Sequence, residues 1–87
     1  MNDTLFLSLS HSTDIPLIDL HESVSVVDAL DQLEKELFNL SRVGHTYVKI
    51  AYGIGDGVLK ENVLNILKSH PLIEDFKASD GFCIAIL

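Results

Sequence analysis

An amphipathic pattern runs between Ser25 and Gly44 and leaves few folds open to this chain. Its apolar positions follow the helical period: Val26, Leu30, Leu33, Leu37 and Leu40. Ser25 is a good helix N-cap, with Asp28 three residues on, and Gly44 suits the left-handed residue that ends many helices. We therefore predict one long helix, whose single apolar stripe must be covered by another layer of structure.

Segments typical of β-strands lie on both sides of this helix. Residues 14–21 and residues 47–52 are rich in β-branched and other apolar side chains. Residues 58–69 return to helical spacing, with a predicted core face of Leu59, Val63, Ile66 and Leu67. The order strand, helix, strand, helix favours an α/β fold in which the helices cover a sheet.

The two ends of the chain complete the predicted sheet. Residues 73–78 and residues 82–87 are β-prone and flank Asp80-Gly81, a pair typical of a tight hairpin turn. Residues 4–10 alternate in part, which predicts a strand or an extended arm. We therefore expect a two-layer α/β sandwich with two helices on a mixed four-stranded sheet, and with room for an extra N-terminal strand.

Length and composition fit a small globular domain. A chain of 87 residues holds one hydrophobic core, and we expect an N-terminal strand or arm over residues 1–14 and the domain proper over residues 15–87. No apolar run reaches the roughly 18 residues of a membrane span, and the start lacks the basic region of a signal peptide. We therefore expect a cytoplasmic protein without membrane contact. Cys83, the single cysteine, excludes an internal disulfide and a zinc ribbon.

The charge balance bears on the choice of partner. Thirteen acidic residues against six basic ones give a formal net charge of −7. Affinity for phosphate backbones comes mainly from Lys and Arg, so this balance argues against tight, nonspecific binding to duplex nucleic acid.

Two loops carry residues of the types that take part in catalysis and ligand binding. Residues 19–22 follow the first predicted domain strand, and residues 52–57 follow the next one. Both loops lead from the carboxyl end of a strand into a helix, which is the edge of an open α/β sheet where ligands bind. We therefore expect the two loops to form one site.

The same loops carry a resemblance to a known family. Ile18-Asp19-Leu20-His21, together with the alternate glycines Gly53, Gly55 and Gly57, resembles the Smr (small MutS-related) domain, which has Leu-Asp-Leu-His-Gly followed later by His-Gly-x-Gly-x-Gly. The resemblance extends from about residue 15 to the C-terminus. It implies a fold like the C-terminal domain of bacterial translation initiation factor three, and an endonuclease-type or nucleic-acid-binding role on DNA or RNA.

The resemblance also implies roles for individual residues. Asp19 and His21 match the family positions associated with cleavage, and the three glycines match the backbone cradle. Lys49 and Lys60 are the cations nearest these loops, so we expect them to contact phosphate. Lys60 keeps the positive charge where family members commonly have arginine.

Three motif positions depart from the family pattern. Tyr52 replaces the histidine of the second motif, and a phenol with a pKa near ~10 is no proton carrier at neutral pH. Glu22, or Ser23 if an extra residue before the helix is placed earlier, stands in place of the glycine of the first motif. Ile54 lies where a basic residue is common between the glycines. These changes predict weakened cleavage on an intact scaffold.

Each motif has a structural alternative. Asp19 and His21 could share a ligand or hold Mg²⁺ or Mn²⁺ through water. In the structural alternative, Asp19 caps the next turn and His21 forms a hydrogen bond at the end of the strand. The glycine loop could bind an anion at a helix N-terminus, or Asp56 could cap that helix. Two functions follow, namely an endonuclease-type domain and a non-catalytic module that docks on a protein partner.

Overall fold

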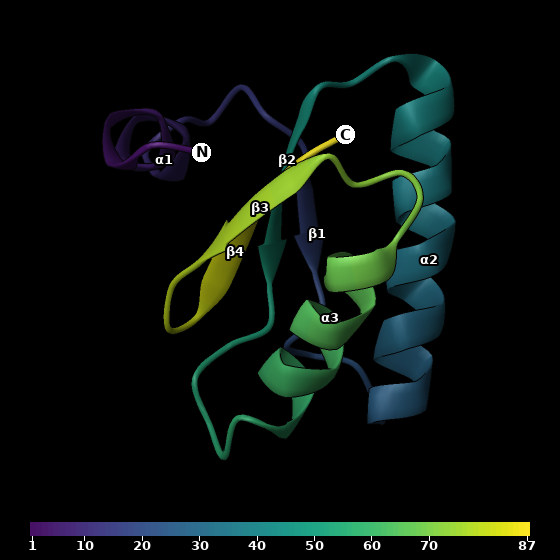
Figure 1. Cartoon of the computed structure of the whole chain (residues 1–87). Helices are drawn as coiled ribbons and strands as arrows, with labels where there is room; N and C mark the ends of the chain where they lie inside the picture. The colour runs from purple at the N-terminus through teal and green to yellow at the C-terminus, as the bar shows by residue number, and fades with distance from the viewer.

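The structure, a computed structural model, describes residues 1–87 and contains three helices and four strands (Figure 1). In chain order they are α1 (Asp3–Ser10), β1 (Leu17–Asp19), α2 (Val26–Val43), β2 (Tyr47–Ala51), α3 (Val58–Ser69), β3 (Asp75–Ala78) and β4 (Phe82–Ile86). The predicted α/β class and the mixed four-stranded sheet are confirmed. Helices α2 and α3 cover one face of the sheet, and α1 lies on the other side (Figure 1).

The sheet has the strand order β1-β2-β4-β3. Strand β1 runs parallel to β2, while β4 is antiparallel to both β2 and β3. The register pairs Asp19 with Ala51 and Ala51 with Phe82. These three residues therefore form one row across the sheet, and paired residues project to the same face.

The main core lies between the sheet and helices α2 and α3. Its buried members include Ile18, Leu20, Ala29, Leu33, Leu37, Val48, Ile50, Val63, Leu67, Cys83 and Ala85. The predicted limits of α2 are confirmed, because the Ser25 side chain accepts a hydrogen bond from the Asp28 N–H and Gly44 ends the helix with φ 102°. Cys83 is fully buried, so burial raises the pKa of its thiol to about 12.

The strand or arm predicted over residues 4–10 is wrong, because this segment is helix α1. Asn2 caps it by accepting a hydrogen bond from the Leu5 N–H at 2.8 Å. Leu9 is then buried and the Phe6 ring stacks on the Phe82 ring. The spacing of these seven residues fits both the helical and the strand period, and the packing of Leu9 and Phe6 on the sheet selects the helix.

Strand β1 covers only part of the predicted residues 14–21. Three residues pair with β2, and the chain before Leu17 runs as a connection from α1. None of the three helices combines the length and the apolar character needed to cross a membrane.

Candidate functional site

The two motif loops meet at the carboxyl ends of β1 and β2. Gly53 adopts φ 78°, and a Cβ atom placed on it would lie 3.0 Å from the Cβ of His21. A side chain at position 53 would therefore be strained twice, once by the left-handed backbone and once by this contact. The loop after β2 can pass over His21 only because residue 53 is glycine.

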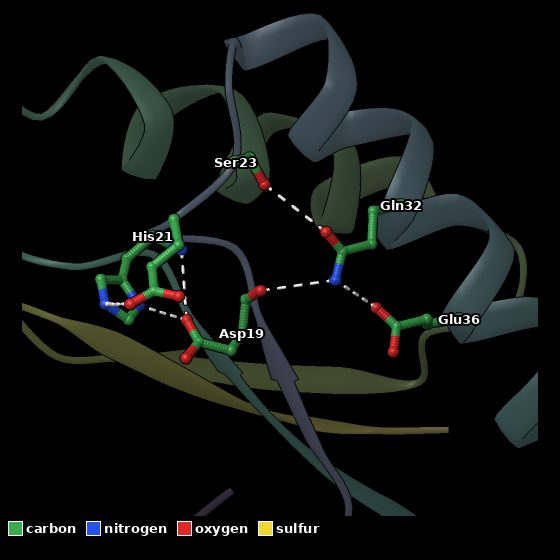
Figure 2. A network of polar contacts seen from close by, with 6 residues as sticks. Asp19, His21, Ser23, Gln32 and Glu36 are labelled. Atoms are coloured by element: carbon green, nitrogen blue, oxygen red, sulfur yellow. Dashed lines mark hydrogen bonds and ion pairs between the residues drawn. The ribbon is translucent and has the colours of Figure 1, made fainter.

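Asp19 and His21 form a carboxylate–imidazole pair (Figure 2). Asp19 Oδ1 contacts His21 Nδ1 and also accepts the His21 backbone N–H at 3.2 Å. This hydrogen bond lowers the pKa of Asp19 and raises the pKa of His21 above its ordinary value. An ionised carboxylate is only an acceptor, so Nδ1 carries a proton and Nε2 is the nitrogen left for a ligand.

Both side chains of the pair remain open to solvent. The exposed fractions are 43% for Asp19 and 48% for His21. Glu22, at the position of the missing glycine, brings a carboxylate oxygen to 3.6 Å from His21 Nε2. The free nitrogen therefore faces solvent beside a negative charge, which adds to the rise in the pKa of His21.

A polar side chain that the sequence analysis did not single out supports the strand end. Gln32, on α2, donates to the Asp19 carbonyl oxygen at 3.4 Å and to Glu36 at 2.8 Å. Its own carbonyl oxygen accepts from the Ser23 hydroxyl at 3.5 Å (Figure 2). Gln32 precedes Leu33 of the apolar stripe of α2, and this polar residue beside the stripe is the sequence signal that could have identified it.

The glycine loop lines a shallow hollow of about 220 Å³. The lining residues are Gly53, Ile54, Gly55, Asp56, Gly57, Lys60 and Asp80. Gly57 is the N-cap residue of α3, with φ 84°, and the Val58 N–H donates to Asp56 Oδ1 at 3.1 Å. The backbone N–H groups of Leu59 and Lys60 have no partner in the chain. They are unpaired donors of the kind that bind anions at a helix start.

The charges around this hollow are mixed. Lys60 brings one cation, while Asp56 and Asp80 bring two carboxylates. Asp56 also occupies the first free N–H of the helix, so the capping role considered for it is present in the structure. An anion in the hollow would therefore gain two backbone donors and one ammonium group, against repulsion from two carboxylates.

The structure does not bring Lys49 into the hollow. Its side chain lies on the sheet face that α1 covers, where Nζ donates to the Ser10 carbonyl oxygen at 3.3 Å. The same ammonium group stands 4.5 Å from the centroid of the Phe82 ring. Lys49 and Lys60 thus belong to different surfaces.

Tyr52 and Ile54, two of the altered motif positions, point in different directions. Tyr52 is only 4% exposed, and its hydroxyl lies 2.8 Å from the carbonyl oxygens of both Ser79 and Phe82. Burial raises the pKa of this phenol, so it is a neutral core group. Ile54 is 86% exposed, and a Cβ atom placed on Gly81 would lie 3.5 Å from its Cγ1. Neither residue offers a second acid or base beside His21.

No three His, Cys, Asp or Glu side chains lie in an arrangement that could hold a metal ion. The carboxylates nearest His21 are Asp19 and Glu22, one on each side of its ring. The site can therefore offer carboxylate contacts to a cation, but it has no metal cage made by the protein alone.

Comparison with known proteins agrees with the two motifs. The family model of the Smr domain matches residues 18–81. The chain is 31% identical over 68 residues to the endonuclease MutS2 of Thermomicrobium roseum, and the match covers 75% of the chain but 9% of that protein. The crystal structure of the Smr domain of Thermus thermophilus MutS2 has the same fold, with a TM-score of 0.78 at 20% identity over 84% of this chain and 98% of that one. This chain belongs to the Smr domain family.

Proposed function

We propose that this Smr domain acts on nucleic acid and cleaves a phosphodiester bond with the Asp19–His21 pair. The observation that carries the proposal is the hydrogen-bonded pair itself, held directly beneath the glycine loop. The name of its relative, an endonuclease, supports the same reaction class. DNA and RNA are both candidate substrates, and a cytoplasmic location suits either.

His21 acts as the proton donor in this mechanism. Asp19 fixes the ring through Nδ1 and favours the protonated imidazole, as the raised pKa of His21 indicates. A water molecule or a ribose hydroxyl attacks phosphorus, and the bond from phosphorus to the leaving oxygen breaks. The leaving oxygen takes the proton from His21 Nε2, and the proton of the nucleophile passes to solvent.

The start of α3 positions the phosphate. The free N–H groups of Leu59 and Lys60 at the start of the helix, with the side chain of Lys60 that lines the hollow, are the donors available to an anion. Asp56 and Asp80 oppose the anion, and the buried Tyr52 supplies no second base. We therefore expect cleavage that is slow and strongly dependent on salt.

A divalent cation such as Mg²⁺ or Mn²⁺ fits this site only together with substrate. Such ions are often bound by one or two carboxylates and by substrate phosphates. Asp19 and Glu22 are the carboxylates available beside His21. When bound, the cation would neutralise charge on the phosphate.

A nicking and degradation assay tests the proposal. Supercoiled plasmid and structured RNA are incubated with the wild type, His21→Ala and His45→Ala, each with Mg²⁺, Mn²⁺ or EDTA. His45 is an exposed histidine just past the opposite end of α2, so its variant is the matched control. We expect cleavage by the wild type and by His45→Ala that is lost in His21→Ala. Equal cleavage by all three proteins would refute the role of His21.

The exposed apolar residues of the two loops favour a second candidate, a non-catalytic module that docks on a protein partner. Val24 is 95% exposed and Ile54 is 86% exposed, each close to acidic side chains. A partner for this surface would present aliphatic side chains. Binding that falls in Ile54→Ser, but does not change with salt or in Lys60→Glu, would support the docking module over the nuclease.

A further inference from the structure

Helix α1 lies outside the segment matched by the family model and covers a distinct face of the sheet. This face is opposite to α2 and α3 (Figure 1). Ile84 on β4 is fully buried although it is not part of the core between the sheet and those two helices. Together with the burial of Leu9, this indicates that α1 shields the middle of the face from solvent.

Aromatic, ionic and hydrogen-bond contacts hold α1 on the sheet, and the N-terminal ammonium group just before the helix pairs with Asp75 of β3. The rings of Phe6 and Phe82 stack with centroids 5.9 Å apart and an interplanar angle of 2°. Asp3 forms an ion pair with Lys77 of β3, whose ammonium group also stands 5.5 Å from the centroid of the Phe6 ring. On the other side of the face, Lys49 donates to the carbonyl oxygen of Ser10 at 3.3 Å.

These contacts reproduce the chemistry by which proteins bind single-stranded nucleic acid. Such proteins offer aromatic rings on which bases stack, together with cations that follow the phosphates. The sheet face offers the ring of Phe82 on β4, with Lys49 of β2 and Lys77 of β3 flanking Ile84 two residues further along that strand. Helix α1 meets this face with one aromatic ring and a carboxylate. Phe6 occupies the place of a base, and Asp3 occupies the place of a phosphate.

We propose that this sheet face, defined by Phe82, Lys49 and Lys77, binds single-stranded nucleic acid, and that α1 is its intramolecular competitor. The inference rests on the proposed function. It adds that the substrate is single-stranded and that α1 regulates its binding. Bases must be unstacked to lie on Phe82, so the ligand is a single strand rather than a duplex. RNA and DNA share this chemistry, and the test below separates them.

The face is continuous with the candidate site. Phe82, Ala51 and Asp19 stand in one row on three adjacent strands. Neighbouring strands are ~4.8 Å apart, so a base on Phe82 would lie roughly 10 Å from the Asp19–His21 pair. A hollow of about 360 Å³, lined by Ser12, Thr13, Ile15, Leu17, Lys49 and Ala51, lies along the same path. A strand bound on the face can therefore reach His21.

The length of α1 makes it a displaceable cover. It has eight residues, and helices shorter than ~12 residues are marginal in water. Its stability therefore depends on the contacts that a bound strand would replace. Binding of a single strand and docking of α1 exclude each other, so weakening the docked state increases the fraction of protein that is free to bind.

Fluorescence anisotropy with labelled oligo-U and oligo-dT of about 12 nucleotides tests the proposal. The variant Asp3→Asn/Phe6→Ala weakens the docking of α1 and leaves the sheet face intact. Leu7→Ala is the matched control, because Leu7 is an exposed α1 residue. We expect the double variant to bind about tenfold more tightly than the wild type, as a larger competent fraction requires, and the control to bind like the wild type. Adding Lys77→Glu to the double variant should remove this gain in affinity.

Heteronuclear NMR of the wild type gives a second readout that needs no substitution. Saturating oligonucleotide should shift the amide signals of Phe82 and Ile84 and move the α1 signals toward random-coil positions. Unchanged affinity in the double variant, with binding still lowered by Lys60→Glu, would overturn the role of α1 and leave the proposed function standing. A lack of both binding and cleavage in every variant would refute both proposals. Preference for oligo-U or oligo-dT identifies the nucleic acid.

Discussion

A Cβ atom on Gly53 would lie 3.0 Å from the Cβ of His21. This relationship connects the two motifs of the chain, because one belongs to the loop after β1 and the other to the loop after β2. The φ of 78° at Gly53 adds a backbone conformation that other residues adopt with strain. The glycine therefore determines both the path of its own loop and the space available to the histidine.

Gly53→Ala should displace His21 and destabilise the domain. We expect a loss of about 1–2 kcal/mol in the free energy of unfolding, from backbone strain and the close contact. Gly44→Ala is the matched control, because Gly44 has φ 102° but open space around its Cβ position. Both variants should lose stability in urea unfolding, and only Gly53→Ala should shift the imidazole NMR signals of His21. Unshifted His21 signals in Gly53→Ala would contradict the contact.

Asp19→Asn should lower the pKa of His21 toward its ordinary value of 6.5, since the hydrogen-bonded carboxylate is the main cause of the rise. The raised pKa of His21 gives a stabilising contribution that is lost as pH rises through it, and the lowered pKa of Asp19 gives one lost as pH falls below 3.8. The pair therefore stabilises most between these limits. An NMR titration of the imidazole protons measures the shift. Glu74→Gln makes an equal charge change at an exposed residue before β3, and it should leave the raised pKa of His21 unchanged.

Tyr52→His should not improve cleavage, although it recreates the family residue in the second motif. The side chain at this position lies in the core and its hydroxyl meets the carbonyl oxygens of Ser79 and Phe82. We expect a loss of at least about 2 kcal/mol in stability, from the lost packing and the changed hydrogen bonds. Urea unfolding measures the loss of stability, and plasmid nicking measures the cleavage rate. Faster nicking by this variant would show that the side chain reaches the site.

Lys60→Glu should weaken binding of oligonucleotides and lower the slope of log affinity against log salt by about one unit. Lys35→Glu is the matched control, since Lys35 is an exposed α2 residue paired with Asp31. Asp56→Asn should act in the opposite direction, because it removes a carboxylate from the hollow. Titrations at several salt concentrations measure all three, and equal slopes for Lys60→Glu and Lys35→Glu would count against a phosphate site at α3.

Folding stability should fall as pH rises above 9. The pKa of the buried Cys83 thiol is raised from 9.0 to about 12, so the unfolded chain loses this proton first. The free energy of unfolding then falls by up to ~1.4 kcal/mol per pH unit between these two pKa values. Cys83→Ala should show a flatter decline than the wild type in urea unfolding at pH 8, 9 and 10. Parallel declines would contradict the burial of the thiol.

Much of the fold could be predicted because local signals agreed with one another. The stripe between Ser25 and Gly44 carried its own start and stop residues, and Asp80-Gly81 carried its own turn. Residues 4–10 had no such signals, and the contact of Phe6 with Phe82 decided their structure. That contact joins residues 76 positions apart, which local spacing does not reveal.

The site could be predicted only in part, for a reason of strand geometry. The position of the two loops at one edge follows from the fold class, and the Asp19–His21 contact follows from their spacing. Lys49 and Tyr52, however, project to opposite faces of the sheet, with Lys49 beneath α1 and Tyr52 in the core. Proximity to the glycines in sequence therefore did not place either residue beside them.

The most direct test of the account is the pH dependence of single-turnover cleavage by the wild type and by Asp19→Asn. If His21 donates the proton, the rate should fall on the alkaline side with an apparent pKa above 6.5, and Asp19→Asn should move this limb to lower pH. An alkaline limb at the same pH in both proteins, or an unchanged profile in His21→Ala, would contradict the assignment of the Asp19–His21 pair as the reactive centre.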